Sequence, residues 1–501
     1  MSRSQINYRP GLITDMYHPD SAYVSWRAGL NGMTTFDLYA RGAPFGGSYL
    51  LVAGLEMALE FVRDFKYTED DLAFLAQIRD YEPGFLQELA RLRFSGEILA
   101  MPEGSIAFPN EPLLRVTAPF REGILLESGL LQAINLATLI ATKASRIVWA
   151  AQGRPVSEFS LRRAQEPFVV TRSSRIGGCW STSFLAAAYH FRLLPTGTVP
   201  HALIQLFDDE RAAFEAIAET YNRYTLLLDT YDPRRAIHTA ADVAKKYRES
   251  LGHILAGVRL DSGDLLADSQ YVRQVLDEAG LRDVRVLASG DLDEFRITEL
   301  LAQGAPIDAF GVGTALGVGA GSVEREVEGG ALGGVYKQVL CVDDSGTAVP
   351  KLKLAGDKTT LPGKKEVYRI GNFEEDVVQL ADEPRPGHDA ERLLKPVVID
   401  GRVVPGSLPP LSEIWEFASR NLKLLPERYR RLEKPETYSV RYSHELLELR
   451  ERAIAAQSKH RPAAVAANEA REDLEPDIER PDQSPEVSGQ TESLESPLRH
   501  T

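Results

Sequence analysis

Five short apolar stretches of this sequence are each followed by residues that could bind phosphate, hydroxyl groups or a metal ion. In chain order these are Arg162 and Arg163 after Phe159; Asp229 after Leu228; Arg259, Asp261 and Asp264 around Leu260; Ser289 and Asp291 after Ala288; and Gly311, Gly313 and Thr314 after Phe310. A guanidinium forks onto phosphate or carboxylate groups, and a carboxylate accepts from hydroxyls or holds Mg²⁺. Successive backbone N–H groups at a Gly-x-Gly turn can cradle an anion. The pattern indicates residues that could meet at one common site, and it does not exclude a small phosphorylated ligand there.

A histidine follows a turn that fixes its position. His201 comes directly after Gly197-Thr198-Val199-Pro200 and precedes an apolar stretch. Neutral imidazole is a competent nucleophile or base near pH 7, provided that a second group orients its other nitrogen. We expect Asp229 to be that orienting carboxylate.

Each of these segments also has an ordinary structural interpretation. The segment around Asp261 could be a charged turn with an internal Arg–Asp pair, and the glycines near Thr314 could form a tight turn. Strand alternation sends neighbouring side chains to opposite faces, so only one of Arg162 and Arg163 is expected to face a common site. Tyr17, in the segment Thr14-Asp15-Met16-Tyr17, could be a core tyrosine.

The elements that would position these residues alternate between strand and helix. The predicted strands are Val156–Phe159, Leu226–Leu228, Ile254–Leu260, Val284–Ala288 and Ala309–Val312. The predicted helices are Leu126–Gln152, Ser181–Phe191, Glu210–Tyr221, Ala240–Leu251, Ser269–Ala279 and Leu292–Gln303. Repeated strand–helix units form either a parallel barrel or an open parallel sheet. Functional residues after five strands favour the barrel, because its strand ends converge on one mouth.

The preceding segment, 1–125, is less regular. Helices are predicted over Asp20–Ala28 and Leu51–Phe65, and strands over Thr34–Arg41, Gly96–Ala107 and Leu113–Ala118. This mixture predicts an α+β domain over 1–125, followed by a βα barrel over 126–345. Residues 458–501 are rich in Glu, Asp, Pro, Ser and Gln and are expected to form a disordered acidic tail.

Composition limits the possible partners and location. The chain has 501 residues and a net charge of -15, which argues against nucleic acid as its main partner. Two cysteines, Cys179 and Cys341, suit a reduced cytoplasmic setting and cannot make a disulfide framework. No apolar signal sequence is visible near Met1, and no stretch is apolar for long enough to cross a membrane.

Taken together, eleven segments in the same order resemble the nicotinate phosphoribosyltransferase family. They are LITDMY (12–17), FDLYARGAPFGGSYLLVAGLE (36–56), TKASR (142–146), EFSLRRAQ (158–165), GTVPHALI (197–204), DTYD (229–232), GVRLDSGDL (257–265), ASGDLDE (288–294), GAPIDAFGVGT (304–314), ALGGVYK (331–337) and LPGKKEVYR (361–369). The resemblance implies an α/β fold in which an incomplete, TIM-like βα barrel packs on an α+β domain. That α+β domain is completed by a C-terminal segment, 346–457.

The resemblance also implies a reaction and its participants. Nicotinic acid and 5-phosphoribosyl 1-diphosphate would give nicotinate mononucleotide and diphosphate in NAD salvage, with Mg²⁺ and with coupled ATP hydrolysis through a phosphohistidine. By motif, His201 matches that histidine. Asp229 and Asp261 join it in the catalytic set, and Asp261 faces ribose hydroxyls or magnesium. Substrate-binding positions are Tyr17 and Phe159 around the pyridine ring, Arg162 and Arg259 near anionic groups, Ser289, Asp291, and the phosphate nest of Gly311, Gly313 and Thr314. Tyr17 would come from the partner in a homodimer.

The physical chemistry of the reaction agrees with these roles. Breaking the ribosyl–diphosphate bond develops positive charge at C1′ and negative charge on the leaving group, which Mg²⁺ and arginine stabilise. The pyridine nitrogen is already nucleophilic, so the protein has mainly to hold the ring in line. Mg²⁺ is expected mainly on the substrate, with Asp261 as the possible protein ligand. Two departures from the family pattern are expected to matter. One is Ala202, where many members have serine after the histidine, and the other is the Cys179-Trp180 loop, which is expected to alter the shape near the base or phosphate.

Several alternatives remain open at this point. A nicotinamide-using relative shares the fold, and a residue near Thr196 is expected to separate the amide from the acid. A quinolinate-using enzyme would need a larger basic cluster for two carboxylates. A non-catalytic nucleotide-binding relative would lack His201, Arg259 or Asp261, all of which are present. A type I phosphoribosyltransferase would carry paired acids before a Thr-Gly loop, which Leu226–Asp232 imitates only faintly.

Overall fold

The computed structural model describes residues 8–343, 345–353 and 360–458 of the chain. By internal contacts the chain divides into one compact unit over Met1–Ala453 and a second over Ile454–Thr501. The tail predicted over 458–501 lies outside the described residues, apart from Ser458. None of the described helices is long and apolar enough to cross a lipid bilayer.

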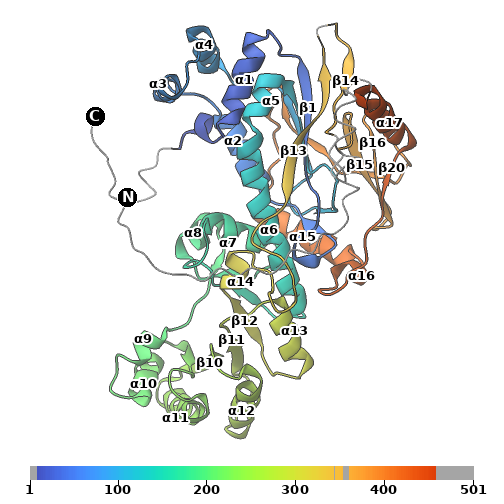
Figure 1. Cartoon of the computed structure of the whole chain (residues 1–501). Coiled ribbons are helices and arrows are strands. Elements are labelled where there is room, and N and C mark those ends of the chain that lie inside the picture. The colour runs from blue at the N-terminus through green and yellow to red at the C-terminus, as the bar shows by residue number, and fades with distance from the viewer. Residues whose placement is uncertain (1–7, 344, 354–359, 459–501) are drawn as a thin grey trace, which may run out of the picture. The chain divides into compact units, whose positions relative to one another are not determined.

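The middle of the chain forms a curved sheet of seven parallel strands (Figure 1). Its strands are β6 (Val156–Glu158), β7 (Ser181–Thr182), β8 (Leu194–Pro195), β9 (Arg223–Leu227), β10 (Ile254–Leu260), β11 (Arg285–Ala288) and β12 (Ala309–Val312). They lie in the order β8-β7-β6-β12-β11-β10-β9, and every pair of neighbours is parallel. Because β8 and β9 form the two edges, the barrel is open between them, which confirms the predicted incomplete βα barrel.

Helices follow these strands, as a parallel connection requires. They are α7 (Pro167–Ile176), α8 (Leu185–Phe191), α9 (His201–Ile204), α10 (Glu210–Thr220), α11 (Pro233–Leu251), α12 (Leu265–Glu278), α13 (Glu294–Ala302) and α14 (Thr314–Gly317). Apolar residues of the central strands form the core between the sheet and these helices, with Val258, Leu260, Val286 and Phe310 all at most 1% exposed. The strands are therefore rigid supports for the loops at their ends.

A second sheet has seven antiparallel strands, which come from both the N-terminal and the C-terminal parts of the described chain. Its order is β14 (Ala348–Pro350), β13 (Gly334–Val342), β1 (Met33–Ala40), β5 (Leu114–Pro119), β3 (Glu97–Ala100), β18 (Lys395–Ile399) and β19 (Arg402–Val403). The α+β domain is thus completed by C-terminal residues, as predicted. The boundary predicted at 345 falls after β13, although β13 pairs with β1 rather than with the barrel.

Smaller elements complete the α+β domain. The additional strands are β2 (Leu50–Leu51), β4 (Ile106–Ala107), β15 (Lys365–Ile370), β16 (Glu375–Leu380), β17 (Glu391–Arg392) and β20 (Val440–Tyr442). The helices are η2 (Pro10–Leu12), α1 (Tyr17–Arg27), η3 (Pro44–Gly46), α2 (Leu55–Asp64), α3 (Glu69–Ile78), α4 (Pro83–Arg91), α5 (Phe120–Leu125), α6 (Glu127–Ala150), α15 (Leu411–Leu424), α16 (Glu427–Arg430) and α17 (His444–Ser458). The long helix α6 contacts α2 and β13 as well as α7 and α13, so it joins the two sheets (Figure 1).

Three predicted elements are interrupted in the structure, each at a residue that breaks regular backbone. The strand predicted over Gly96–Ala107 is broken into β3 and β4 at the turn containing Gly104, whose φ is 87°. The helix predicted over Leu51–Phe65 begins only at Leu55, after Gly54 at a φ of 98°. The segment Ser181–Phe191, predicted as one helix, begins with the short strand β7 and becomes helical only at Leu185. The Thr182 hydroxyl accepts from the Phe184 N–H and donates to Glu158, which holds the start of the segment out of the helix.

Candidate functional site

A cavity of about 470 Å³ lies at the carboxyl ends of the parallel strands. Ten of the twelve site residues singled out in the sequence line it: Phe159, Arg162, His201, Arg259, Asp261, Ser289, Asp291, Gly311, Gly313 and Thr314. The remaining two, Tyr17 and Asp229, are not among its lining residues. The convergence follows from strand direction, since the same ends of parallel strands meet at one edge.

Acidic residues after the strands divide into two kinds. Asp232, Asp264 and Asp293 accept hydrogen bonds from backbone N–H groups at the first turns of α11, α12 and α13. Such N-caps hold the helix start in place. The acid that precedes each cap, namely Asp229, Asp261 or Asp291, is not used in this way and remains near the cavity.

The guanidinium of Arg259 is held by three partners. Its Nε donates to Ser289 Oγ at 2.7 Å, Nη1 to Thr198 Oγ1 at 2.7 Å, and Nη2 to Asp261 Oδ1 at 2.5 Å. Burial alone would raise the pKa of Asp261, but hydrogen bonds from Ser289 and Arg259 outweigh burial and hold that pKa below its ordinary value. Asp261 is therefore a carboxylate at neutral pH, able to accept from a hydroxyl or to face a cation.

His201 begins the short helix α9, in the connection that spans the open side of the barrel. Its Nδ1 lies 3.1 Å from the Thr230 hydroxyl, and its Nε2 lies 3.7 Å from Asp261 Oδ2. The expectation that Asp229 orients this ring is wrong, because Asp229 Oδ2 instead accepts from the Asp261 N–H at 2.9 Å and from Ser262 Oγ at 2.6 Å. Asp229 thereby holds the Asp261 turn, and the adjacent Thr230 contacts the imidazole.

An aromatic ring lies against a glycine at the floor of the cavity. Phe159 follows β6, and its N–H donates to the Val312 carbonyl at 2.8 Å. A Cβ on Gly311 would lie 2.4 Å from the Phe159 ring, so only glycine leaves room for it. A Cβ on Gly313 would lie 3.3 Å from the Phe159 carbonyl oxygen. A planar ligand could stack on the free face of this ring.

Buried hydrogen bonds fix the loop beside that ring. Glu158 is 1% exposed, and its carboxylate accepts from Ser160, Thr171 and Thr182. These bonds join β6, α7 and β7 beneath the loop that begins at Phe159. The ring is consequently supported by a fully satisfied polar network.

Two guanidiniums at the cavity are available to an anionic ligand. Arg162 and Arg163 both line the cavity, although strand alternation predicted only one of them. The chain has already left β6 and turns here, so alternation no longer applies. Neither side chain has a hydrogen-bond or ion-pair partner within residues 8–343, 345–353 and 360–458, in contrast to Arg259.

Tyr17 lies elsewhere in this chain. It is the first residue of α1, is 55% exposed, and has its ring centroid 4.0 Å from that of His18. The interpretation of Tyr17 as a core residue is therefore wrong. A single chain does not bring Tyr17 to the cavity lining.

Sequence reasoning missed several lining residues because nothing in their type signals chemistry. Ser183 and Thr198 both line the cavity, and Thr230 contacts His201 just outside it. The residue that separates amide from acid was expected near Thr196. Thr196 itself is not in the lining, and its N–H donates to the Thr182 carbonyl, whereas Thr198 lines the cavity. Ser183 follows β7 and lines the cavity together with Phe159. The short β7 was the missing signal, since it aligns Ser183 with the other strand ends.

No preformed metal cage was found within the described residues, where no group of three or more His, Cys, Asp or Glu side chains suits a metal ion. Asp261 and Asp291 are the cavity carboxylates that a cation carried by a substrate could meet. This arrangement fits Mg²⁺, which keeps most of its waters and binds through one or two carboxylates together with substrate phosphates.

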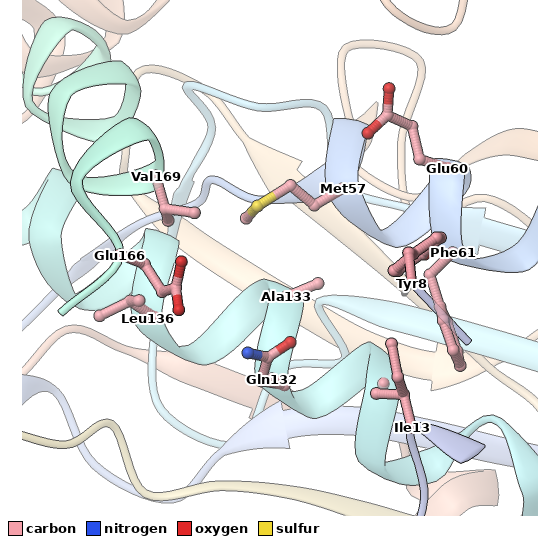
Figure 2. A pocket seen from close by; sticks show the side chains of 11 residues that line it. Tyr8, Ile13, Met57, Glu60, Phe61, Gln132, Ala133, Leu136, Glu166 and Val169 are labelled. Atoms are coloured by element: carbon pink, nitrogen blue, oxygen red, sulfur yellow. The ribbon is translucent and has the colours of Figure 1, made fainter. Parts of the chain in front are cut away.

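A second cavity, of about 210 Å³, lies between α2, α6 and the start of α7 (Figure 2). Met57, Leu136 and Val169 supply apolar walls, and Gln132 and Glu166 supply polar groups. None of the predicted site residues lines this cavity. The chemistry predicted from the sequence therefore gathers in the larger cavity at the strand ends.

Comparisons with known proteins agree with this site. Residues 12–135 match the family model of the nicotinate phosphoribosyltransferase N-terminal domain, and residues 385–450 match that of the C-terminal domain. The chain is 38% identical to nicotinate phosphoribosyltransferase of Bacillus subtilis over 465 residues, covering 87% of this chain and 93% of that protein. It is also 38% identical to a nicotinate phosphoribosyltransferase of Mycobacterium tuberculosis over 450 residues, covering 88% and 94%. Among solved structures, human nicotinic acid phosphoribosyltransferase matches with a TM-score of 0.76 at 30% identity, covering 88% of this chain and 99% of that one.

Proposed function

The chain belongs to the nicotinate phosphoribosyltransferase family, and we propose that it is an enzyme joining nicotinic acid to 5-phosphoribosyl 1-diphosphate in NAD salvage. The pyridine nitrogen attacks C1′ of the ribose, the bond from C1′ to the diphosphate oxygen breaks, and nicotinate mononucleotide and diphosphate leave. The observation that carries this proposal is the cavity at the strand ends, which combines the Phe159 ring, the guanidiniums of Arg162 and Arg163, and a glycine turn.

Each part of the substrates has a complementary group in the cavity. The pyridine ring stacks on Phe159. Arg162 and Arg163 bind the carboxylate of that ring and the diphosphate. Ribose hydroxyls donate to Asp261 and Asp291. The 5′-phosphate accepts from backbone N–H groups of the Gly311–Thr314 turn.

Mg²⁺ is proposed to bind to the enzyme together with the diphosphate of the substrate. It would neutralise the charge that develops on the leaving group, with Asp261 and Asp291 as the available protein oxygens. Hydrogen bonds from Ser289 and Arg259 keep Asp261 ionised and hold it at the cavity.

We propose that His201 couples ATP hydrolysis to the reaction. The Nε2 side of its ring faces the Asp261 carboxylate, which can only accept, so the single proton of neutral imidazole belongs on Nε2. The lone pair is then on Nδ1, beside the Thr230 hydroxyl. This nitrogen attacks the γ-phosphorus of ATP, ADP leaves, and water later cleaves the phosphohistidine to phosphate.

The proposal includes a homodimer. Tyr17 belongs by motif to the pyridine site, yet in one chain it is exposed on α1 and absent from the cavity lining. A symmetric pair in which each protomer supplies Tyr17 to its partner's cavity would complete both sites. We also propose a cytoplasmic setting, because Cys179 and Cys341 are both free thiols.

The deciding experiment follows labelled nicotinic acid with 5-phosphoribosyl 1-diphosphate and Mg²⁺, with and without ATP. We expect nicotinate mononucleotide, formed faster with ATP, and loss of the ATP effect in His201→Ala. His388→Ala, which changes an exposed histidine outside the cavity, is the matched control. Product from nicotinamide or quinolinate alone would overturn the substrate, and indifference to both ATP and His201 would overturn only the coupling.

A further inference from the structure

A buried ion cluster lies behind the loop that carries Ser289 and Asp291. Lys143 and Arg146 come from α6, and Glu294 is the first residue of α13. These three side chains are 0%, 1% and 0% exposed, respectively. Lys143 Nζ lies 2.5 Å from Glu294 Oε2, and Arg146 Nε lies 3.0 Å from Glu294 Oε1. The cluster takes no part in the proposed chemistry, because none of its members lines the cavity.

The cluster is firmly anchored on its α6 side. Lys143 Nζ lies 4.8 Å from the centroid of the Phe45 ring, and Arg146 Nη2 donates to the Leu432 carbonyl at 3.2 Å. Burial alone would raise the pKa of Glu294, but the adjacent Lys143 and Arg146 charges outweigh burial and hold it below its ordinary value. The carboxylate is therefore charged, and it ties the start of α13 to the helix that joins the two sheets.

The loop between β11 and α13 is fixed at both of its ends. At its start, the Ser289 N–H donates to the Leu260 carbonyl at 2.9 Å, and Ser289 Oγ donates to Asp261 at 2.5 Å. At its end, Asp293 caps α13 directly before Glu294. Only Gly290, Asp291 and the buried Leu292 lie between these anchors.

The backbone between the anchors is forced into an unfavourable conformation. Asp291 has a φ of 40°, in the left-handed region that residues with a Cβ avoid. Gly290 precedes it at a φ of 82°, and a Cβ there would lie 1.8 Å from the Asp261 carbonyl oxygen. Such a conformation persists only where the surroundings over-determine it. Here it leaves Asp291 exposed at the cavity wall.

We propose that Lys143, Arg146 and Glu294 are positioning residues that hold the Asp291 carboxylate at the ribose site by fixing the start of α13. This inference rests on the proposed function, in which Asp291 accepts from the ribose of 5-phosphoribosyl 1-diphosphate. Loss of the cluster would let the loop relax and would withdraw Asp291, weakening binding of that substrate.

The test compares two changes, alone and together. Lys143→Met/Glu294→Gln removes the cluster's ion pairs. It deletes one positive and one negative charge, so the net charge of the cluster stays at one positive, and Arg146 keeps an amide oxygen as partner. Asp291→Gly removes the carboxylate and tolerates a positive φ. Thermal melting and circular dichroism confirm that each variant folds. Calorimetric binding of 5-phosphoribosyl 1-diphosphate is measured beside KM and kcat.

The expected result is a coupling between the two changes. Lys143→Met/Glu294→Gln alone raises KM and Kd for 5-phosphoribosyl 1-diphosphate roughly tenfold or more, and kcat stays within about threefold. In the Asp291→Gly background the same double change adds nothing. Unchanged binding in the folded double variant, or an equal rise in both backgrounds, would overturn the inference.

The binding arm separates this inference from the proposed function. Wild-type protein that binds 5-phosphoribosyl 1-diphosphate but makes no nicotinate mononucleotide would reject the proposed reaction, and the coupling would still be read from Kd. Wild-type protein that binds none of this substrate would overturn both.

Discussion

At the scale of single residues, one hydroxyl group sets the direction of the proposed nucleophile. Thr230 Oγ1 is the hydrogen-bond partner of His201 Nδ1, whereas the carboxylate expected in that place holds the neighbouring turn. A hydroxyl can donate to a lone pair and then swing away, which a carboxylate cannot do. In the proposed coupling, the ring would thus be oriented without a proton on the nitrogen that attacks ATP.

Replacing Thr230 by valine tests this arrangement. Removing one such hydrogen bond, worth ~1 kcal/mol, should reduce the stimulation of nicotinate mononucleotide formation by ATP about fivefold. The rate without ATP should change little, because the ring does not touch C1′ in the proposed reaction. Thr230→Ser restores the hydroxyl and should recover the stimulation; serine and valine variants that behave alike would contradict the role.

A second prediction at this scale concerns pH. Burial, followed by the nearby Asp232 charge, raises the pKa of Glu210 to about 7 from an ordinary 4.5. A raised pKa means that the contribution of Glu210 to stability is complete below pH 4.5 and is lost as pH rises through about 7.

Glu210→Gln should therefore flatten the pH dependence of stability across this window. Urea unfolding midpoints between pH 4 and 8 would measure it, with Glu219→Gln, an exposed change on the same helix, as the control. We expect the Glu210 variant to be more stable than the wild type at the alkaline end. Parallel curves for wild type and Glu210→Gln would rule out this titration.

At the scale of elements, the close approach of β6 and β12 places the stacking ring. The two strands are parallel neighbours, and Phe159 can lie over Gly311 only because that residue has no side chain. The cavity floor is consequently a property of the strand pair, and it tolerates no extra methyl group.

Gly311→Ala should displace the Phe159 ring, because the new Cβ would start 2.4 Å from it. We expect KM for nicotinic acid to rise roughly tenfold or more, with a smaller change for 5-phosphoribosyl 1-diphosphate. Gly42→Ala is the control, since a Cβ at that exposed turn meets nothing within 4 Å. Steady-state kinetics with each substrate varied in turn would decide. An equal effect on both substrates would contradict a selective loss of ring stacking and would show that the change also disturbs the Gly311–Thr314 turn.

The elements also show what sequence patterns could and could not predict. The strands β10 and β12 were predicted to the residue, because apolar runs ending in turn residues mark buried parallel strands. The two-residue strands β7 and β8 carry no such run, so their loop residues, Ser183 above all, were missed. Periodicity shows that acids follow the strands but not which acid caps a helix, because capping depends on the backbone of the next turn. The sequence pattern likewise does not show which residue after β9 contacts His201, so Asp229 was predicted where Thr230 lies.

At the scale of the whole molecule, the proposed role of Tyr17 requires a second chain. Tyr17 is exposed on α1, while the cavity expected to receive its ring lies at the barrel mouth. The proposed homodimer gives this separation a consequence that two variants, each impaired in ATP-stimulated activity, can reveal.

Mixing Tyr17→Ala with His201→Ala should restore ATP-stimulated activity. After co-refolding of equal amounts, half of the dimers are mixed, and each mixed dimer holds one site with both residues intact. We therefore expect about a quarter of the wild-type stimulation. Sedimentation would confirm the dimer, and the separate variants would set the baseline. A mixture no more active than its components would place Tyr17 in the site of its own chain or outside any site.

The pairing of β1 with β13 has a consequence for how the chain is made. About 300 residues separate the two strands, and the barrel lies between them. At roughly 5–20 residues per second, a ribosome takes about 15–60 s to deliver β13 after β1 has emerged. During that time one edge of β1 has no partner, and β3 likewise waits for β18. The barrel, continuous in the chain, can fold in this interval while the first-made sheet remains unfinished, so the nascent protein exposes open strand edges that attract aggregation.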